Sequence, residues 1–383
     1  MRSTLKAFPV LAAALLSSAA FAQQPTIKIG SVLALTGPGA AIATSAAEGI
    51  RYAVEQANAQ GGLDVKGTKY KLEYISYDDQ LKAAEAVSAY NRLIERDKVK
   101  YVFTMISASH LALKSKIEDD DVFVMTSAVS DKAIDADTKH VVRIQTLLKD
   151  YIPPMVSWMR KNMKGDKIVK IYPNDESGRF VAKLTDDAMQ KAGYKASTEF
   201  VERQAKDFAP VLTKILADPP DIIDTGPSSP ATSGLIVRQA RELGYKGQFV
   251  LMGGSGQREV LEAVGKEGAE GLVHLVFADP ANKDYQTLAA FYQKKYGNPP
   301  NELIVNFFDG AAMMLKAIQV AGTPDEPQKV RAAFPSIFPF KSLQGQTLTF
   351  GGKDSIGADA QVFSINYIAV MKDGQSVVVG EAR

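Results

Sequence analysis

Apolar and polar positions along the chain predict strands and helices in regular alternation. A strand-like run over 27–33 precedes a helical pattern over 45–58, and a second strand over 70–77 precedes a helix over 81–96. Apolar runs of about four to eight residues are typical of buried strands, whereas apolar positions on one face of a longer segment are typical of helices. This alternation predicts a parallel sheet with helices on both faces.

The segment 100–130 contains one complete parallel unit. Its apolar runs at 101–106 and 122–125 are separated by a helical pattern over 111–118. Two buried strands joined by a helix are typical of parallel α/β structure. The carboxyl ends of these two strands are therefore expected to lie side by side.

Short hydroxyl residues follow both strand ends. Ser107 and Ser109 come directly after the first run, and Ser130 closes the loop after the second. Open α/β sheets bind ligands at this edge, because helix N-termini expose backbone N–H groups there and small side chains leave room. We expect Ser107 and Ser130 to anchor a ligand. The alternative is that these serines only cap helices.

The same alternation restarts in the second half of the chain. Two copies of the pattern predict an α/β protein with two doubly wound, Rossmann-like lobes. More elements follow the second copy, so we expect the chain to cross between the lobes again. These crossings predict a multi-strand hinge. The strands of this half are expected at 141–144, 167–172, 197–201, 221–224, 249–252, 271–276, 347–350 and 362–371, and the helices at 178–192, 210–217, 231–243, 284–296 and 302–321.

The length of 383 residues favours two domains, because one ordinary core does not grow so large. We expect the N-terminal lobe to comprise residues 23–145 and 277–355. The C-terminal lobe is expected to comprise residues 146–276 and 356–383.

Residues 1–22 have the pattern of a secretory signal peptide. Arg2 and Lys6 precede an apolar run over 7–16, and the sequence of 20–22, Ala-Phe-Ala, has the small residues of a cleavage site. The run is too short to span a bilayer, and no cysteine follows it that could carry a lipid anchor. We therefore expect a soluble protein exported to the periplasm, with no other stretch that crosses a membrane.

Charge and composition exclude several classes of function. Without Arg2 and Lys6, the 45 basic residues fall to the same number as the 43 acidic residues, which disfavours nucleic-acid binding. The absence of cysteine excludes disulfides, cysteine nucleophiles and thiolate metal sites. His110, His140 and His274 are far apart and have no metal-ligand spacing, so we expect surface or packed histidines and no metal.

No catalytic motif is recognisable, so neither an enzyme nor a cofactor is expected. The segment 253–257 fails as a nucleophile elbow because its last residue is Gln257 instead of glycine. The segment 37–42 has Ile42 where a dinucleotide-binding turn has its third glycine, so an ordinary turn is preferred. An exported hydrolase remains an alternative without a nucleophile and base to support it.

Several short motifs, in this order along the chain, resemble the type I periplasmic substrate-binding proteins of ABC transporters, in the branched-chain amino-acid (Leu/Ile/Val)-binding family. The resemblance implies two lobes that close on a ligand. It also implies a monomer that delivers an amino acid or a related small carboxylate to a permease complex in the inner membrane. The motifs are Ile29-Gly30, 35–38, Glu48-Gly49, 57–62, 77–80, 100–130, 238–244, 269–272 and 308–310.

The resemblance places the carboxylate of a bound amino acid against the hydroxyls of Ser107 and Ser130. The backbone of Ala128 then lies near the ammonium group. Hydrogen bonds to a charged group contribute about 1.5–3 kcal/mol each, so dipoles alone can hold this anion without a cationic side chain.

The second lobe departs from the family pattern. Aromatic positions of the family fall on Ser177 and Ser229, and Ile42 stands at such a position in the first lobe. The acidic residue that meets the ligand ammonium falls near Gly254 or Ser255. Because an unpaired buried ammonium is unfavourable, a carboxylate without an ammonium, including an aromatic acid, is a serious alternative. A periplasmic sensor on the same fold is another.

Overall fold

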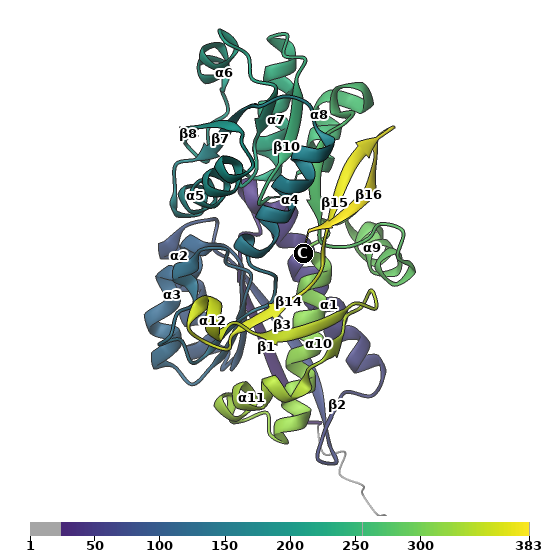
Figure 1. The fold of residues 1–383 in the computed structure, drawn as a ribbon. Helices are drawn as coiled ribbons and strands as arrows, with labels where there is room; N and C mark the ends of the chain where they lie inside the picture. Colours follow the sequence, from purple (N-terminus) through teal and green to yellow (C-terminus); the bar gives the residue numbers. More distant parts are fainter. Residues whose placement is uncertain (1–23, 255, 383) are drawn as a thin grey trace, which may run out of the picture.

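The computed structural model describes residues 24–254 and 256–382 and shows two α/β lobes, each built on its own sheet (Figure 1). The two sheets confirm the expected fold class. The expected signal peptide, residues 1–22, lies outside the described residues.

The sheet of the first lobe is parallel at its centre and antiparallel at its edges. Strands β14, β6, β5, β4, β1 and β3 run parallel, and β12, β13 and β2 are added antiparallel. Thr104 pairs with Thr126, so β4 and β5 end at the same level. In the described part of the chain this sheet has nine strands, in the order β12 (Phe340–Lys341), β13 (Thr347–Gly351), β14 (Gln361–Phe363), β6 (Val141–Arg143), β5 (Phe123–Thr126), β4 (Tyr101–Thr104), β1 (Thr26–Leu33), β3 (Thr68–Asp78) and β2 (Leu63–Val65).

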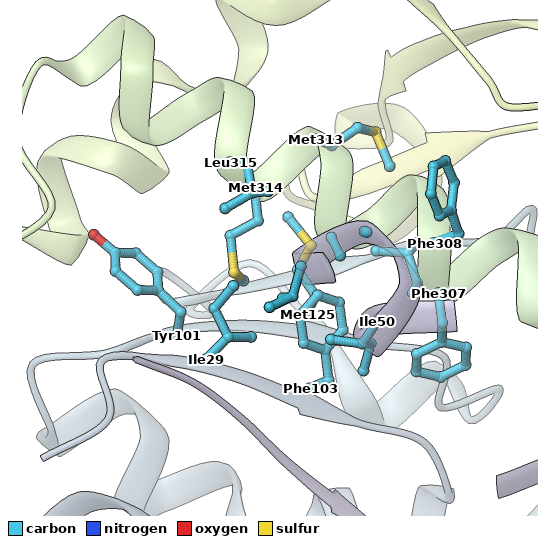
Figure 2. Packing of buried hydrophobic residues seen from close by; sticks show 14 of the residues in the cluster. Ile29, Ile50, Tyr101, Phe103, Met125, Phe307, Phe308, Met313, Met314 and Leu315 are labelled. Carbon is cyan, nitrogen blue, oxygen red and sulfur yellow. The ribbon is translucent and has the colours of Figure 1, made fainter. Parts of the chain in front are cut away.

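Helices cover both faces of this sheet, and the largest core lies under α1 and α10. Gly49 of α1 permits close contact, because a Cβ there would overlap the carbonyl oxygen of Ile304. In Figure 2, Phe307 of α10 lies near Phe103 of β4, with ring centroids 6.2 Å apart. The α-helices of this lobe are α1 (Ala40–Ala59), α2 (Ala83–Asn91), α3 (Ser107–Asp119), α9 (Lys283–Tyr296), α10 (Ile304–Ala321), α11 (Pro327–Ala333) and α12 (Lys353–Ile356), with short turns η1 (Gly37–Gly39), η2 (Arg92–Arg96), η3 (Asp131–Ala133) and η4 (Phe334–Ile337).

Helix α10 corrects one expectation. By length and composition alone it could cross a membrane, whereas no such stretch was expected after residue 22. In the structure 72% of it is buried, so it is a core helix of the first lobe. Its apolar character follows from contact with the sheet on one side and α1, α11 and η4 on the others.

The second lobe repeats the arrangement. Ile168 of β7 belongs to one core cluster and Val169 to another, because successive side chains of a strand point to opposite faces and both faces are covered. The sheet comprises, among the residues described, the parallel strands β8 (Lys195–Val201), β7 (Lys167–Pro173), β9 (Ile222–Asp224), β10 (Gln248–Leu251) and β11 (Val273–Val276), then the antiparallel β15 (Asn366–Lys372) and β16 (Gln375–Ala382), and its helices are α4 (Leu148–Asn162), α5 (Glu176–Lys191), α6 (Ala209–Leu216), α7 (Pro230–Glu242) and α8 (Gln257–Ala269).

The described chain crosses between the lobes after β6, after β11 and after β14. The run expected as one β segment over 362–371 is split, with β14 in the first sheet and β15 in the second. The last crossing therefore follows Phe363, beyond the boundary at residue 355 expected from the sequence. Thr146 Oγ1 donates to the carbonyl of Ser364 at 2.6 Å and accepts its N–H at 2.8 Å, so two crossing segments are tied together.

Candidate ligand-binding site

A cavity of about 130 Å³ lies between the lobes and is lined by both of them. Its first-lobe wall is mainly apolar, and its second-lobe wall is richer in hydroxyl groups. The first lobe and the hinge contribute Gly39, Ile42, Leu81, Met105, Ile106, Ser107, Ser127, Val129, Gln145, Phe277 and Leu303, and the second lobe contributes Tyr151, Ser177, Arg203, Pro227, Ser228, Ser229, Pro230, Gly253 and Gly254.

Ser107 is the first residue of α3, three residues after the end of β4, and it lines the cavity. Its Oγ accepts the backbone N–H groups of Val129 and Ser130, each at 3.1 Å. A serine hydroxyl has two acceptor lone pairs and one donor. Because both lone pairs are engaged, the O–H of Ser107 is left to donate to an acceptor in the cavity.

Ser130 is buried but is not among the cavity-lining residues. Its Oγ accepts the N–H of Lys132 at 3.3 Å, which caps η3, and donates to Glu176 Oε1 of the second lobe at 3.4 Å. The structure thus gives this serine the capping role that the sequence left open. Ser127, three residues earlier on the same loop, lines the cavity instead.

Ala128 also lies behind the cavity wall. Its carbonyl accepts Arg143 Nε at 2.8 Å, and Arg143 Nη2 donates to the carbonyl of Ser130 at 2.8 Å. Arg143 is 1% exposed, and burial lowers its pKa to about 10. The backbone that the family resemblance places near a ligand ammonium therefore already has a buried guanidinium against its carbonyl.

Ser109 belongs to the interior of the first lobe. It is buried on α3 beside the carboxyl of Asp79, whose pKa is raised by burial. It is not among the residues that line the cavity. Its position two residues beyond Ser107, about 200° around the helix axis, turns it away from the cleft.

The positions that depart from the family pattern do meet at the cavity. Ile42, Ser177, Ser229 and Gly254 all line it, while Ser255 lies outside the described residues. Ser229 Oγ accepts the N–H of Thr232 at 3.3 Å and so caps α7. A Cβ at position 254 would overlap the carbonyl oxygen of Gly226, so the backbone here admits only glycine.

Arg203 is a cavity residue that the sequence analysis missed. It follows β8, and its Nε and Nη2 donate to the carboxylate of Asp175, with Nη2 3.0 Å from Oδ1. Burial alone would raise the pKa of Asp175, but the Arg203 guanidinium holds it below its usual value. Arg203 carries the only charged side chain among the described lining residues, and none of them is acidic. The one sequence signal that indicated Arg203 as a site residue was its place after a predicted strand.

Comparison with known proteins places the chain in a family. A model described as periplasmic binding protein matches residues 26–375. The chain belongs to that family. It is 30% identical over 262 residues to the Leu/Ile/Val/Thr-binding protein of Salmonella typhimurium, which covers 67% of this chain and 69% of that protein.

Solved structures show the same fold. The leucine-binding protein of Thermotoga maritima has a TM-score of 0.79 at 24% identity and covers 93% of this chain and 99% of that one. A solute-binding protein from Rhodopseudomonas palustris, solved in complex with benzoate, has a TM-score of 0.77 at 16% identity and covers 93% and 96%. This periplasmic binding protein therefore has the type I fold. It is a member of a family of binding proteins and not an enzyme.

The histidines of this binding protein have structural contacts. His110 Nδ1 lies 2.9 Å from Thr104 Oγ1, and His274 Nε2 lies 2.9 Å from Ser376 Oγ. Burial lowers the pKa of each to about 4, so both are neutral at pH 7. Within residues 24–254 and 256–382 no group of histidine, aspartate and glutamate is arranged to hold a metal ion.

Proposed function

We propose that this protein binds a small carboxylate with an apolar body and no ammonium group, and delivers it in the periplasm to the permease complex of an ABC importer. The observation that carries the proposal is the absence of an acidic side chain from the described lining of the cavity. The one charged lining residue, Arg203, is paired with Asp175. The walls therefore offer hydroxyl and N–H donors to a carboxylate, whereas the ammonium of a zwitterion would have no counter-ion.

None of the positions that the resemblance pairs with an ammonium supplies a carboxylate. The backbone at position 254 admits no side chain, and position 255 is a serine. The carbonyl of Ala128 already accepts a hydrogen bond from Arg143, whose positive charge would repel an ammonium beside it. Burying an ammonium without partners costs several kcal/mol even after the protein relaxes, about as much as micromolar binding can supply.

The carboxylate has a donor ready in the first lobe. Ser107 must donate, and Ser127 lies beside it on the neighbouring strand tip. Two or three hydrogen bonds of about 1.5–3 kcal/mol each, with burial of an apolar body, reach the roughly 8 kcal/mol of micromolar affinity.

The size of the cavity limits the ligand. An engineered apolar cavity of about 150 Å³ in another protein holds one benzene molecule. The cavity here is about 130 Å³, and Ile42, Met105 and Leu303 are among its apolar walls. One ring, or a branched chain of similar volume, is the expected apolar body.

An amino acid is the second candidate, because the relative that is 30% identical is a Leu/Ile/Val/Thr-binding protein. A structure of the same fold was solved with isoleucine and another with benzoate, so the fold accommodates both chemistries. A sensor that presents the ligand to a membrane receptor would use the same cavity. Genes for a permease and an ATPase beside this one would favour transport.

Isothermal titration with matched ligand pairs tests the proposal. L-leucine is compared with 4-methylpentanoate, and L-phenylalanine with 3-phenylpropanoate, because each pair differs only in the α-amino group. We expect the acid without the amino group to bind at least about tenfold more tightly in one pair, a difference of about 1.4 kcal/mol. Tighter binding of both amino acids would support the second candidate instead.

A further inference from the structure

The second-lobe wall of the cavity contains a buried hydroxyl that has no hydrogen-bond partner among the described residues. Ser228 is 5% exposed and lines the cavity, and its Oγ has no hydrogen-bond partner in the described part of the protein. Buried polar groups in native proteins nearly always have a partner, and those without one call for a missing water, ion or ligand. Because Ser228 is also one of the residues that line the cavity, a bound ligand can supply that partner.

Arg203 offers a further donor at the same wall. Asp175 engages its Nε and Nη2, and its Nη1 makes only a long contact, 3.4 Å, with the carbonyl of Pro227. Because Nη1 carries two N–H groups, at least one remains for the cavity. The carboxylate of Asp175 balances the charge of the guanidinium, so a neutral oxygen can take this donor as readily as an anion.

Two more hydroxyls enlarge this polar wall. Tyr151 of α4 and Ser177 of α5 line the cavity, and neither hydroxyl is bonded to another group among residues 24–254 and 256–382. The first-lobe side of the cavity is mainly apolar apart from Ser107, Ser127 and Gln145 at the hinge. Both lobes therefore contribute polar groups to the cavity, and apolar side chains make up most of the first-lobe wall.

We propose that the ligand is a carboxylate that carries a second, neutral oxygen, a hydroxyl or oxo group, at its far end, and that Ser228 and Arg203 bind this oxygen. This inference rests on the proposed function and adds the substrate class to it. The carboxylate binds at the strand tips of the first lobe and the second oxygen at the wall of the second. Such a ligand bridges the lobes and holds them closed.

Titration of two ligand pairs on the unmodified protein tests the inference. Benzoate is compared with 4-hydroxybenzoate, and 3-phenylpropanoate with 3-(4-hydroxyphenyl)propanoate, because each pair differs by one hydroxyl. We expect the hydroxyl to raise affinity about five- to tenfold in at least one pair, as one added hydrogen bond would. Benzene-1,4-dicarboxylate is a third probe, because it places an anion at the far end.

Ser228→Ala should remove most of the gain from the hydroxyl and leave the affinity for the unsubstituted acid nearly unchanged. Thr225→Val is the matched control. The Thr225 hydroxyl is also buried without a partner and lies three residues away, but Thr225 does not line the cavity. This variant should keep the full gain, and thermal melting of both variants checks that they fold.

The outcomes separate the two proposals. If the unsubstituted acids bind but the hydroxyl adds nothing, or if the gain survives in Ser228→Ala, the second oxygen is refuted while the proposed function stands. Tighter binding of the dicarboxylate than of the hydroxy acid would also refute a neutral oxygen. If no carboxylate binds at all, the proposed function itself fails. Because the ligand pairs are compared on the unmodified protein, a variant that does not fold leaves the test intact.

Discussion

The hydroxyl oxygen of Ser107 accepts the backbone N–H of Ser130 at 3.1 Å, which joins the loops that follow β4 and β5 at the edge of the first sheet. This hydrogen bond joins the side chain of one residue to the backbone of the other. The sequence predicted two hydroxyls facing one ligand, whereas the structure pairs one hydroxyl with the amide of the other residue. Ser107 therefore both builds the loop and faces the cavity, and the hydroxyl of Ser130 serves the junction of the lobes.

Ser107→Ala should weaken carboxylate binding and destabilise the fold at once. The ligand loses one donor, and the N–H groups of Val129 and Ser130 lose their acceptor. We expect affinity to fall about 10- to 100-fold and the free energy of unfolding to fall by about 1–3 kcal/mol. Titration and urea unfolding measure the two effects. Ser109→Ala, on the same helix but outside the cavity wall, should leave affinity unchanged, and unchanged affinity in both variants would remove Ser107 from the site.

Arg143→Met should lower stability strongly, although Arg143 does not line the cavity. The substitution leaves the carbonyls of Ala128 and Ser130 and the Oε1 of Gln361 without the donor that now reaches them. Each buried acceptor left unpaired costs about 1–3 kcal/mol, so a loss of about 3 kcal/mol or more is expected. Arg96→Met, at an exposed arginine, is the control. Equal urea midpoints for the two variants would show that the buried guanidinium does not organise this loop.

Glu302 should make ligand affinity depend on pH. Gln257 of α8 in the second lobe donates to Glu302 Oε1 at 2.5 Å, and Glu302 Oε2 is buried without a partner in the described structure. Burial raises the pKa of Glu302 from 4.5 to about 7, with Glu259 raising it further and Arg258 lowering it. Between about pH 4.5 and pH 7 the folded protein therefore holds a proton that the unfolded chain has released, so stability should fall as pH rises to about 7. Because the contact between Gln257 and Glu302 joins the two lobes, we expect ligand affinity to fall over the same range.

Glu302→Gln separates this effect from other buried acids. It should flatten the affinity profile between about pH 5 and pH 7, because the neutral amide keeps the contact between the lobes at every pH. Asp309→Asn is the matched control. Burial also raises the pKa of Asp309 to about 7, but its partner is the N–H of Leu343 in the same lobe. The control should change the pH dependence of the melting temperature and leave that of affinity unchanged; a Glu302→Gln profile as steep as the original would exclude the role of Glu302.

The ion pair between Lys132 and Glu176 should contribute little to closure. It crosses the lobes at 3.0 Å, but the two side chains are 66% and 37% exposed. Exposed pairs contribute about 0–1 kcal/mol and are screened by salt. Glu176→Gln and Ser130→Ala should therefore each change Kd by less than about fivefold, and the effect of Glu176→Gln should shrink further in high salt. A larger loss in titrations would mean that this junction controls closure.

Local periodicity was enough to predict the architecture. The parallel unit around 100–130 is present as β4, α3 and β5, and the second series of strands and helices forms the second lobe. Helix α8 was missed because glycines interrupt its pattern at 265 and 268, and Gly265 has a non-helical backbone. The split of 362–371 between two sheets was also missed, because an apolar run does not show which sheet its residues join.

The site was predictable in the first lobe only in part. Ser107 was predictable because it lies between a buried strand and a helix, and both elements are evident from the local sequence. Arg203 and Ser228 lie in the second lobe, far from Ser107 in sequence, and they share a cavity with it because the lobes close together. Likewise, the carbonyl of Ala128 accepts a hydrogen bond from Arg143, whose burial no local pattern reports. Periodicity records which face of a strand or helix is buried, but the contents of a cleft depend on how two separately folded lobes meet.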